Sequence, residues 1–182
     1  MDNLKMPGNL NIITRPEVSK DLPGIFALHK IVFGQDNEAI LVDALRRTGA
    51  FIPNLSLVAI SGDQIVGHIL FTRIQVGDET GNTSESLALA PMAVKPGFQK
   101  MGIGAKLIRT GLEKAKEEGF KSVIVLGHEH YYPKFGFQPA EKWNIRPPFK
   151  VPPNVFMAIE LVNGGLNNVS GTVIYPKEFD AV

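Results

Sequence analysis

The spacing of hydrophobic residues along the chain predicts three helices. After Asp21-Leu22-Pro23, a capping residue followed by a proline in the first turn, apolar residues recur at helical spacing until Gly34. A second helix is expected over residues 38–48. The residues expected to face inward from it are Ile40, Leu41, Ala44 and Leu45. The clearest helix is Gly102–Glu118, which has one apolar face and one charged face.

Between the helices, shorter runs of apolar residues predict strands. In chain order these runs are Leu10–Thr14, Leu55–Ile60, Gln64–Ile74, Leu87–Val94, Lys121–Leu126, Phe137–Ala140, Val155–Leu161 and Thr172–Tyr175. A tight turn at Ser61-Gly62-Asp63 joins two of them, and the polar stretch Gly77–Ser86 is expected to be a mobile loop. This order predicts an α/β (α+β) fold with a central mixed sheet and helices on both faces, in a single domain spanning residues 1–182.

Composition narrows the function. The chain has 182 residues, 44% hydrophobic and 20% charged, with a formal net charge of +1, so nothing indicates a broad surface for nucleic acid. There is no cysteine, which excludes disulfides, thiolate metal sites and a cysteine nucleophile. No secretory signal and no membrane-spanning run of about 20 apolar residues is recognisable, so we expect a cytoplasmic protein.

The most informative segment is Val94–Gly104, which follows a predicted strand and opens the clearest helix. The first amides of a helix have no intrahelical partner and lie at the positive end of its dipole. Gly102 and Gly104 carry no side chains, so a pyrophosphate could rest directly on these amides, with Gln99 and Lys100 as further donors. The alternative is a tight strand-to-helix turn without a ligand. The GxxxxGK[ST] motif and the third glycine of a dinucleotide fingerprint are both missing.

Pro91 interrupts the strand Leu87–Val94. Proline cannot donate to a ladder, so it marks an edge or a bulge. A bulge here would separate this strand from Lys121–Leu126 and leave backbone groups of Met92 and Val94 facing a gap. An extended arm that carries amides, such as pantetheine, could pair with them. The alternative is a simple edge strand with a proline kink.

Two motifs then carry a resemblance to a known family. Gln99-x-x-Gly102-x-Gly104, followed after the next strand by Tyr131-Tyr132-x-x-Phe135-Gly136-Phe137, resembles the GNAT (Gcn5-related) N-acetyltransferase superfamily. Further segments are similar to its YhbS-like subgroup. They are Glu38–Arg46, Ala90–Val94, Val125–Gly127 and Phe156–Tyr175.

The resemblance implies the GNAT fold, with a V-shaped opening between its central strands, and acetyl-CoA as the donor. Residues 87–140 would form the cofactor-binding core and residues 155–182 a C-terminal strand extension. The cofactor-binding residues would be Met92, Ala93, Val94, Gln99, Lys100, Met101, Gly102, Ile103, Gly104, Ala105 and, bordering the cofactor, His128. Tyr132 would be the general acid that protonates the leaving thiolate. A phenol with a pKa of about 10 is protonated at neutral pH and suits that role. For Tyr131 we expect packing instead.

The general base and the acceptor site have weaker signals. Glu85, near the start of the central strand, is a possible base, as are His68, His128 and Glu129. His128-Glu129-His130 lacks the spacing of a zinc motif, so no metal is expected. In the resembled fold two loops line the acceptor groove. Asp36 and Glu38 in one could bind a cationic amine, whereas Trp143, Arg146 and Phe149 in the other could suit an aromatic or acidic acceptor.

The predicted function is an N-acetyltransferase that transfers the acetyl group of acetyl-CoA to a primary amine of a small molecule or peptide, by direct attack in a ternary complex. The alternative is a non-catalytic acyl-CoA sensor, which would need no Tyr132. A nucleotide oxidoreductase is disfavoured by the missing third glycine. No nucleic acid or membrane partner is expected. A homodimer is possible through the tail after Asn163.

Overall fold

A computed structural model describes residues 11–181. Its elements are β1 (Ile12–Pro16), α1 (Leu22–Phe33), α2 (Asn37–Leu45), β2 (Phe51–Ser61), β3 (Gln64–Gly77), β4 (Thr83–Val94), α3 (Ile103–Glu117), β5 (Ser122–Leu126), β6 (Gln138–Pro139), β7 (Ile145–Arg146), β8 (Phe156–Glu160) and β9 (Gly171–Ile174). Five 3-10 turns complete them: η1 (Ser19–Asp21), η2 (Tyr132–Phe135), η3 (Ala140–Trp143), η4 (Pro153–Val155) and η5 (Lys177–Ala181).

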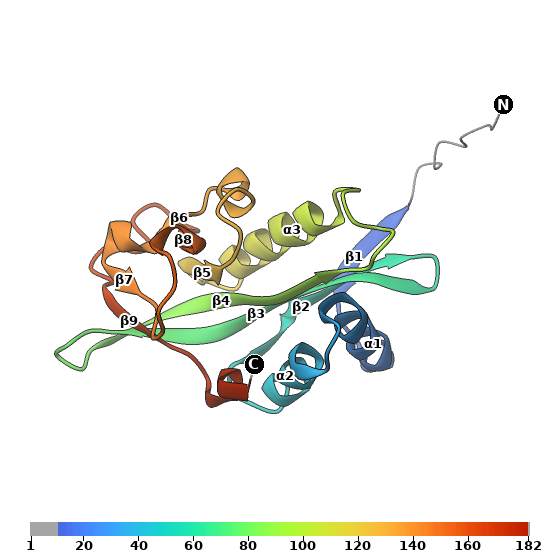
Figure 1. Ribbon diagram of the computed structural model, residues 1–182. Helices are drawn as coiled ribbons and strands as arrows, with labels where there is room; N and C mark the ends of the chain where they lie inside the picture. The colour runs from blue at the N-terminus through green and yellow to red at the C-terminus, as the bar shows by residue number, and fades with distance from the viewer. Residues whose placement is uncertain (1–10, 182) are drawn as a thin grey trace.

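The described strands form a mixed sheet in the order β1-β2-β3-β4-β5-β8-β6, and β9 pairs with both β3 and β7. The pairs β4–β5 and β7–β9 are parallel, and the other pairs are antiparallel. Helix α3 covers one face of the sheet, while α1 and α2 cover the other (Figure 1). The predicted mixed sheet with helices on both faces is therefore confirmed.

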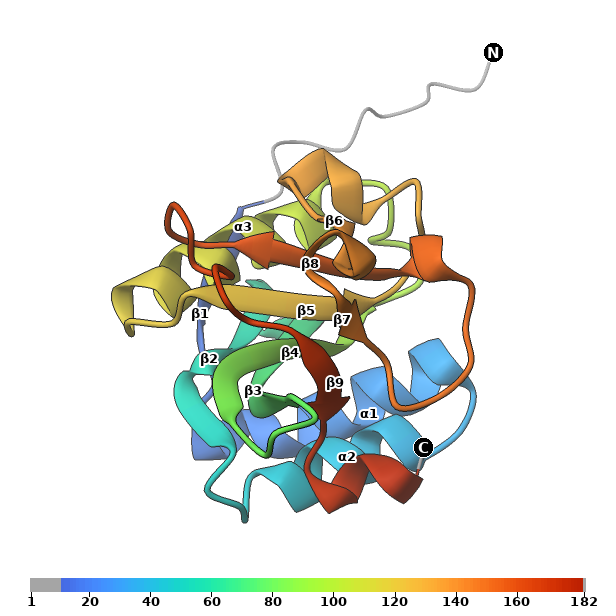
Figure 2. The same cartoon turned by 90° about the vertical axis from the view of Figure 1, so that its left-hand side faces the viewer.

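The core is divided between the two faces. Under α3, the side chains of Leu107, Ile108 and Phe71 belong to one large buried cluster. On the opposite face, one cluster lies beneath α1 and α2, and another includes Ile124, Ala158 and Val173. The C-terminal segment crosses this second face from β9 and ends beside α2 (Figure 2). It thereby brings residues 175–181 to the side of the sheet away from α3, whereas residues 171–174 form β9 within the sheet.

Most predicted elements lie where expected, and the differences are local. The predicted loop 77–86 is shorter than expected and spans only residues 78–82, because β3 runs to Gly77 and pairs there with Thr83 at the start of β4. Pairing of β3 with β9 on its other side extends it. Ile40, expected to face inward, is 53% exposed. The first strand is shifted to Ile12–Pro16, and the predicted starting residue Leu10 lies outside the described residues.

Asp21 precedes α1 as predicted, but its carboxylate makes no cap bond to that helix. It accepts hydrogen bonds from the Val18 amide (2.8 Å) and from the Arg15 guanidinium (2.6 and 3.0 Å) instead. Strand β9 finds its partners within the same chain, so its pairing needs no second copy. The predicted homodimer and the single-domain organisation stay predictions.

A chain of buried polar groups joins β3 to α1. His29 Nε2 lies 2.8 Å from His68 Nδ1, and His68 Nε2 lies 2.9 Å from the Ser56 hydroxyl. The Ser56 hydroxyl in turn donates to the carboxylate of Glu17, which also binds Arg46. One tautomer satisfies every donor: each histidine donates from Nε2, and only the acceptor Nδ1 of His29 is left without a partner. Both imidazoles are therefore expected to be neutral.

This pair predicts a pH-dependent stability. Burial, together with the charges of His68 and Arg46, lowers the pKa of His29 to about 3, and burial also lowers the pKa of His68. Below about pH 6.5 the unfolded chain therefore binds protons that the folded chain does not, and stability falls as the pH falls toward 3. Between about pH 7.5 and pH 5 we expect His29 to cost about 2 kcal/mol of the free energy of unfolding, measured with urea, and His68 to add to the loss in the same direction.

Glu17 does not contribute to the pH dependence of stability between about pH 7.5 and pH 5. Burial opposes its ionisation, but hydrogen bonds from His68, Arg46 and Ser56 outweigh burial and lower the pKa of Glu17 to about 2. Its contribution is present above about pH 4.5 and is lost only as the pH falls toward 2. Replacing His29 with leucine should remove the part of the loss that His29 contributes, whereas replacing the exposed His130 with glutamine should not change the loss. Equal stability at both pH values would contradict the neutral pair.

Candidate active site

Strands β4 and β5 diverge where the sequence predicts a break. Their parallel pairing extends over only two positions, the second being Ala88 opposite Ile124. The register of β4 against β3 then shifts between Leu89 and Met92, so the segment around Pro91 forms a bulge. The predicted bulge and the predicted separation of the two strands are thereby confirmed. Beyond this point β4 and β5 are no longer paired, and a gap opens between their ends.

The loop between β4 and α3 has the backbone geometry of an anion-binding loop. Three of its residues have positive φ angles: Gly97 (87°), Lys100 (63°) and Gly102 (80°). Left-handed residues turn neighbouring amides toward one side, which makes a concave surface for anions. Gly102 is the N-cap of α3, so the unpaired first amides of that helix follow it directly. The loop therefore combines turned amides with the positive end of a 15-residue helix.

A cavity of about 310 Å³ lies between this loop and the end of β4. Its lining residues are Met92, Val94, Phe98, Gln99, Lys100, Gly102, Ile103, Gly104, Ala105 and Tyr131. The structure thus brings together most of the predicted cofactor-binding residues. Three of them are not part of the lining: Ala93 is buried, Met101 is 48% exposed and His128 is exposed at the turn after β5. The Gln99 side-chain amide donates to the Val94 carbonyl (3.1 Å), which ties the loop to β4.

Gly104 allows the cavity to reach the first turn of α3. A Cβ atom at this position would lie 2.9 Å from the Tyr131 hydroxyl and 3.6 Å from a methyl of Val94. Any side chain here would occupy the space above the first amides of the helix. The cradle therefore fits a ligand whose anionic group must approach the backbone closely.

The position of the Tyr131 hydroxyl was not predicted from the sequence. Its ring packs edge-on against Phe135 as expected, with 5.3 Å between centroids, but its hydroxyl reaches the cavity beside Gly104. Two cations lie near these rings, because Arg109 stacks over Phe135 and Lys134 over Tyr131. With Lys100 they give this end of the molecule a local positive charge that the net charge of +1 does not reveal.

Tyr132 lies deeper, in the cluster under α3. Its ring packs against Phe137, with 5.6 Å between centroids, and against the backbone of Gly127. Burial, followed by the neighbouring Tyr131, raises the pKa of Tyr132 to about 12, so its hydroxyl carries a proton throughout the physiological range. Gly127 follows β5 directly, so the ring of Tyr132 packs at the end of that strand, but Tyr132 is not among the residues that line the loop cavity.

The other predicted residues lie apart from this cavity. Glu85 is exposed, pairs with Arg73 (3.4 Å) and precedes Ala90 by five positions, about 16 Å along a strand. Asp36 pairs with Lys30 (3.0 Å), and Glu38 accepts hydrogen bonds from Gln35 (3.1 and 3.2 Å). The roles of Glu85, Asp36 and Glu38 stay predictions.

A second cavity, of about 210 Å³, lies at the start of the gap between β4 and β5. Its lining residues are Ala88, Leu89, Ala90, Ile124, Leu126, Phe149, Tyr175 and Phe179. Phe149 stacks on Tyr175 with 6.2 Å between centroids, and Tyr175 contacts Phe179 at 5.1 Å. Of the aromatic residues weighed for the acceptor groove, Phe149 reaches this cavity, whereas Trp143 packs against the cluster of Ile124, Ala158 and Val173 and against Lys142.

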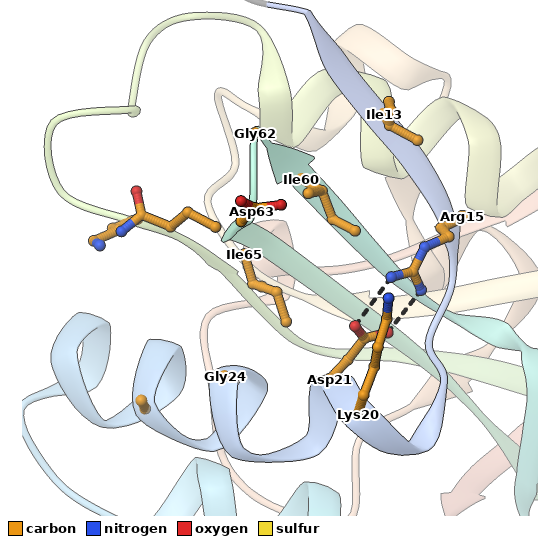
Figure 3. Close-up of a pocket in the computed structure, with 12 residues that line it drawn as sticks. Ile13, Arg15, Lys20, Asp21, Gly24, Ile60, Gly62, Asp63 and Ile65 are labelled. Atoms are coloured by element: carbon orange, nitrogen blue, oxygen red, sulfur yellow. Dashed lines mark hydrogen bonds and ion pairs between the residues drawn. The ribbon is translucent and has the colours of Figure 1, made fainter.

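A recess of about 780 Å³ lies elsewhere, between β1, α1 and the β2–β3 turn (Figure 3). Arg15 and Asp21 line it together and are joined by an ion pair, as Figure 3 shows. Lys20 and Asp63 also line it. None of the residues predicted for cofactor or acceptor binding does so. The volume of a cavity alone therefore does not identify the active site.

Among residues 11–181, no three histidine, aspartate or glutamate side chains are grouped in a way that could hold a metal ion. Of the helices in the same part of the chain, none combines the length and hydrophobicity that a bilayer-spanning segment requires.

Comparison with known proteins agrees with this geometry. The Acetyltransferase (GNAT) family matches residues 26–137. The chain is 46% identical over 107 residues to YjhQ, an uncharacterized N-acetyltransferase of Escherichia coli, a match that spans 59% of each protein. It is 32% identical over 170 residues to YhbS, an uncharacterized N-acetyltransferase of the same organism, covering 93% of this chain and 99% of YhbS.

Two crystal structures extend the likeness to three dimensions. The structure of E. coli YhbS in complex with CoA superimposes with a TM-score of 0.87 at 30% identity, over 97% of this chain and 96% of that one. A GNAT family acetyltransferase from Brucella melitensis in complex with acetyl-CoA gives a TM-score of 0.76 at 29% identity, over 94% of this chain and all of the other. Both structures have the same mixed sheet as this chain. The first contains coenzyme A and the second contains acetyl-CoA.

Proposed function

The chain belongs to the GNAT acetyltransferase family, and from this premise we propose that it transfers the acetyl group of acetyl-CoA to a primary amine by direct attack in a ternary complex. The observation that carries the proposal is the cavity at the start of α3. There a loop with positive φ angles, the end of the bulged strand β4 and the first turn of a long helix meet. This set of donors suits a pyrophosphate followed by an extended arm that bears amides.

Most of the predicted site residues would bind acetyl-CoA, and one of them would transfer a proton. Amides of the segment 99–105 would hold the pyrophosphate, and the backbone of Met92 and Val94 would pair with the pantetheine arm beside the gap. The bound donor supplies an acetyl thioester as the electrophile. Ala93 lies between the two pairing residues and keeps the strand extended. Met101 and His128 would contribute at the margin of the site.

Tyr132 would act as the general acid. The amine forms a C–N bond as the C–S bond breaks, the amine proton passes to solvent, and the tyrosine hydroxyl gives its proton to the departing sulfur; the tyrosinate then regains a proton from solvent. The raised pKa of Tyr132 keeps this proton in place until the sulfur accepts it. Glu85 is too far along β4 to reach the gap directly, so water is the simplest acceptor of the amine proton.

Two measurements test this proposal. Calorimetry should show acetyl-CoA binding, and a thiol-release assay with a broad amine panel should show acetyl-CoA-dependent turnover. An absence of binding at millimolar acetyl-CoA would contradict the proposal. Tight binding without turnover on any amine would favour the sensor alternative, which needs the loop but not Tyr132.

Replacing Gly127 with alanine tests the position of Tyr132. The new Cβ would lie 2.2 Å from a ring carbon of Tyr132, so the ring must move. We expect turnover to fall by about 10²-fold, the effect of a small misplacement of a catalytic group, with little change in acetyl-CoA affinity. Gly49 is the matched control, because a Cβ there meets nothing within 4 Å. Unchanged turnover in Gly127→Ala would argue against Tyr132 as the acid.

A further inference from the structure

The apolar cavity of about 210 Å³ opens on the face of the sheet away from α3. Along β4, Leu87 and Leu89 pack into the cluster under α3, whereas Ala88 belongs to the cluster on the opposite face together with Ile124. Tyr175 and Phe179 belong to the C-terminal segment that crosses this second face (Figure 2). The cavity beside the phosphate loop and the apolar cavity therefore adjoin the same strand from different sides.

The two cavities are lined by β4 residues on either side of the bulge. Residues 88–90 of β4 line the apolar cavity, and Met92 and Val94, just beyond Pro91, line the cavity of the phosphate loop. On β5, Leu126 lines the apolar cavity and is followed by Gly127, against which Tyr132 packs. A group held in the apolar cavity would thus lie at the mouth of the gap, next to the place where the proposed thioester would be held.

The lining of this cavity is uncharged and aromatic. Its walls are the rings of Phe149, Tyr175 and Phe179, and burial raises the pKa of Tyr175 to about 12, so that ring stays neutral. At its mouth Leu126 is 46% exposed and Phe149 is 44% exposed. Apolar cavities of about 150 Å³ in other proteins admit benzene, so the volume here is sufficient for one aromatic ring with a short linker.

We propose that this cavity is the acceptor subsite and that the acceptor is a primary amine that carries a compact, uncharged aromatic group on a short linker. The inference rests on the proposed acetyltransferase function. Of the residues weighed for the acceptor in the sequence, Phe149 lines the cavity, whereas Trp143, Arg146, Asp36 and Glu38 do not. The ring would stack among Phe149, Tyr175 and Phe179, and the nitrogen would point into the gap between β4 and β5.

Such a subsite also favours the reactive form of the amine. An ammonium group that leaves water for apolar surroundings, without a carboxylate partner, has a lowered pKa. The uncharged lining thus helps to produce the free base that attack requires. A second ammonium in place of the ring, as in a diamine, would have to be buried without a partner and would be rejected.

The test compares phenethylamine with putrescine, which carries a second ammonium where phenethylamine carries the ring. With acetyl-CoA as donor, we expect kcat/KM for phenethylamine to exceed that for putrescine by about 10²-fold or more. Phe149→Asp places a carboxylate at the mouth of the cavity and should reduce this ratio by at least about tenfold, with the KM for acetyl-CoA unchanged. Val162→Asp, a substitution at another exposed apolar residue, should leave the ratio unchanged.

The possible results distinguish a failure of the proposed acceptor subsite from a failure of the proposed acetyltransferase function. Equal kcat/KM for the two amines, or a ratio that Phe149→Asp does not change, would overturn the subsite while leaving acetyl transfer intact. Efficient use of hexanoyl-CoA that Phe149→Asp abolishes, with amine selectivity unchanged, would assign the cavity to the acyl chain and also overturn it. Thiol release with neither amine nor any other amine, despite acetyl-CoA binding, would remove the proposed function and the subsite together.

Discussion

Replacing Tyr132 with phenylalanine is expected to lower kcat by about 10²–10⁴-fold, the usual contribution of a positioned general acid, and to leave acetyl-CoA affinity nearly unchanged. We expect the loss to be confined to kcat because the two side chains differ only in the hydroxyl group. The ring is buried against Phe137 and Gly127, so phenylalanine should pack in the same way and only the proton is lost. Steady-state thiol release gives kcat, and calorimetry gives the affinity.

Tyr131→Phe is the matched control for this prediction. It removes the neighbouring hydroxyl, which lies beside Gly104 in the loop cavity, and should affect acetyl-CoA binding more than turnover. The pH profile adds a second readout. Because burial raises the pKa of Tyr132 to about 12, kcat should not decline on the alkaline side until the pH is well above 10. A Tyr132→Phe enzyme with wild-type kcat would show that another group, or water, protonates the sulfur.

Replacing Gly104 with valine should weaken acetyl-CoA binding by about 10²-fold or more. A side chain here would fill the cradle between Tyr131, Val94 and the first turn of α3, and would keep the pyrophosphate off the helix amides. Losing two hydrogen bonds to a charged group costs about 3 kcal/mol or more, which corresponds to this factor. Calorimetric titration with acetyl-CoA measures the loss directly, and thermal melts check that the variant folds.

Gly49→Val is the control, since the space around that residue is open. A second variant separates two causes of the loss. If Gly104→Ala acts mainly by displacing the Tyr131 hydroxyl, the double variant with Tyr131→Phe should bind acetyl-CoA no more weakly than Tyr131→Phe alone; if the methyl itself covers the amides, the double variant should be weaker than Tyr131→Phe alone. Wild-type affinity in Gly104→Val would place the pyrophosphate somewhere other than the start of α3.

Local signals allowed the loop and its surroundings to be predicted. Gly102 and Gly104 at the start of an amphipathic helix, and Pro91 within an apolar strand, are features of short segments, and the structure brings them together at one cavity. The strand hydrogen bonds that carry β3 as far as Gly77 were not predictable in the same way. On one side the end of β3 pairs with the nearby start of β4, and on the other side it pairs with β9, which lies about a hundred residues later in the chain.

Within the proposed active site, too, features of short segments were predictable and contacts between distant segments were not. Tyr132 was singled out by its motif, whereas the reach of the Tyr131 hydroxyl to Gly104 depends on how η2 packs against α3. The aromatic wall of the second cavity combines Phe149 from a proline-rich loop with Tyr175 and Phe179 from the C-terminus. Their spacing along the sequence carries no periodic signal, so only the fold reveals that they share a site.

The most direct test of the central claim is an amide-resolved NMR titration of the full chain with acetyl-CoA. If the loop holds the pyrophosphate and β4 pairs with the pantetheine arm, the largest shifts should occur at the amides of residues 99–105 and of Met92 and Val94, with smaller shifts at Gly127 and Tyr132. Saturable binding that leaves the 99–105 amides unshifted, or perturbs residues around the Arg15–Asp21 recess instead, would contradict the claim.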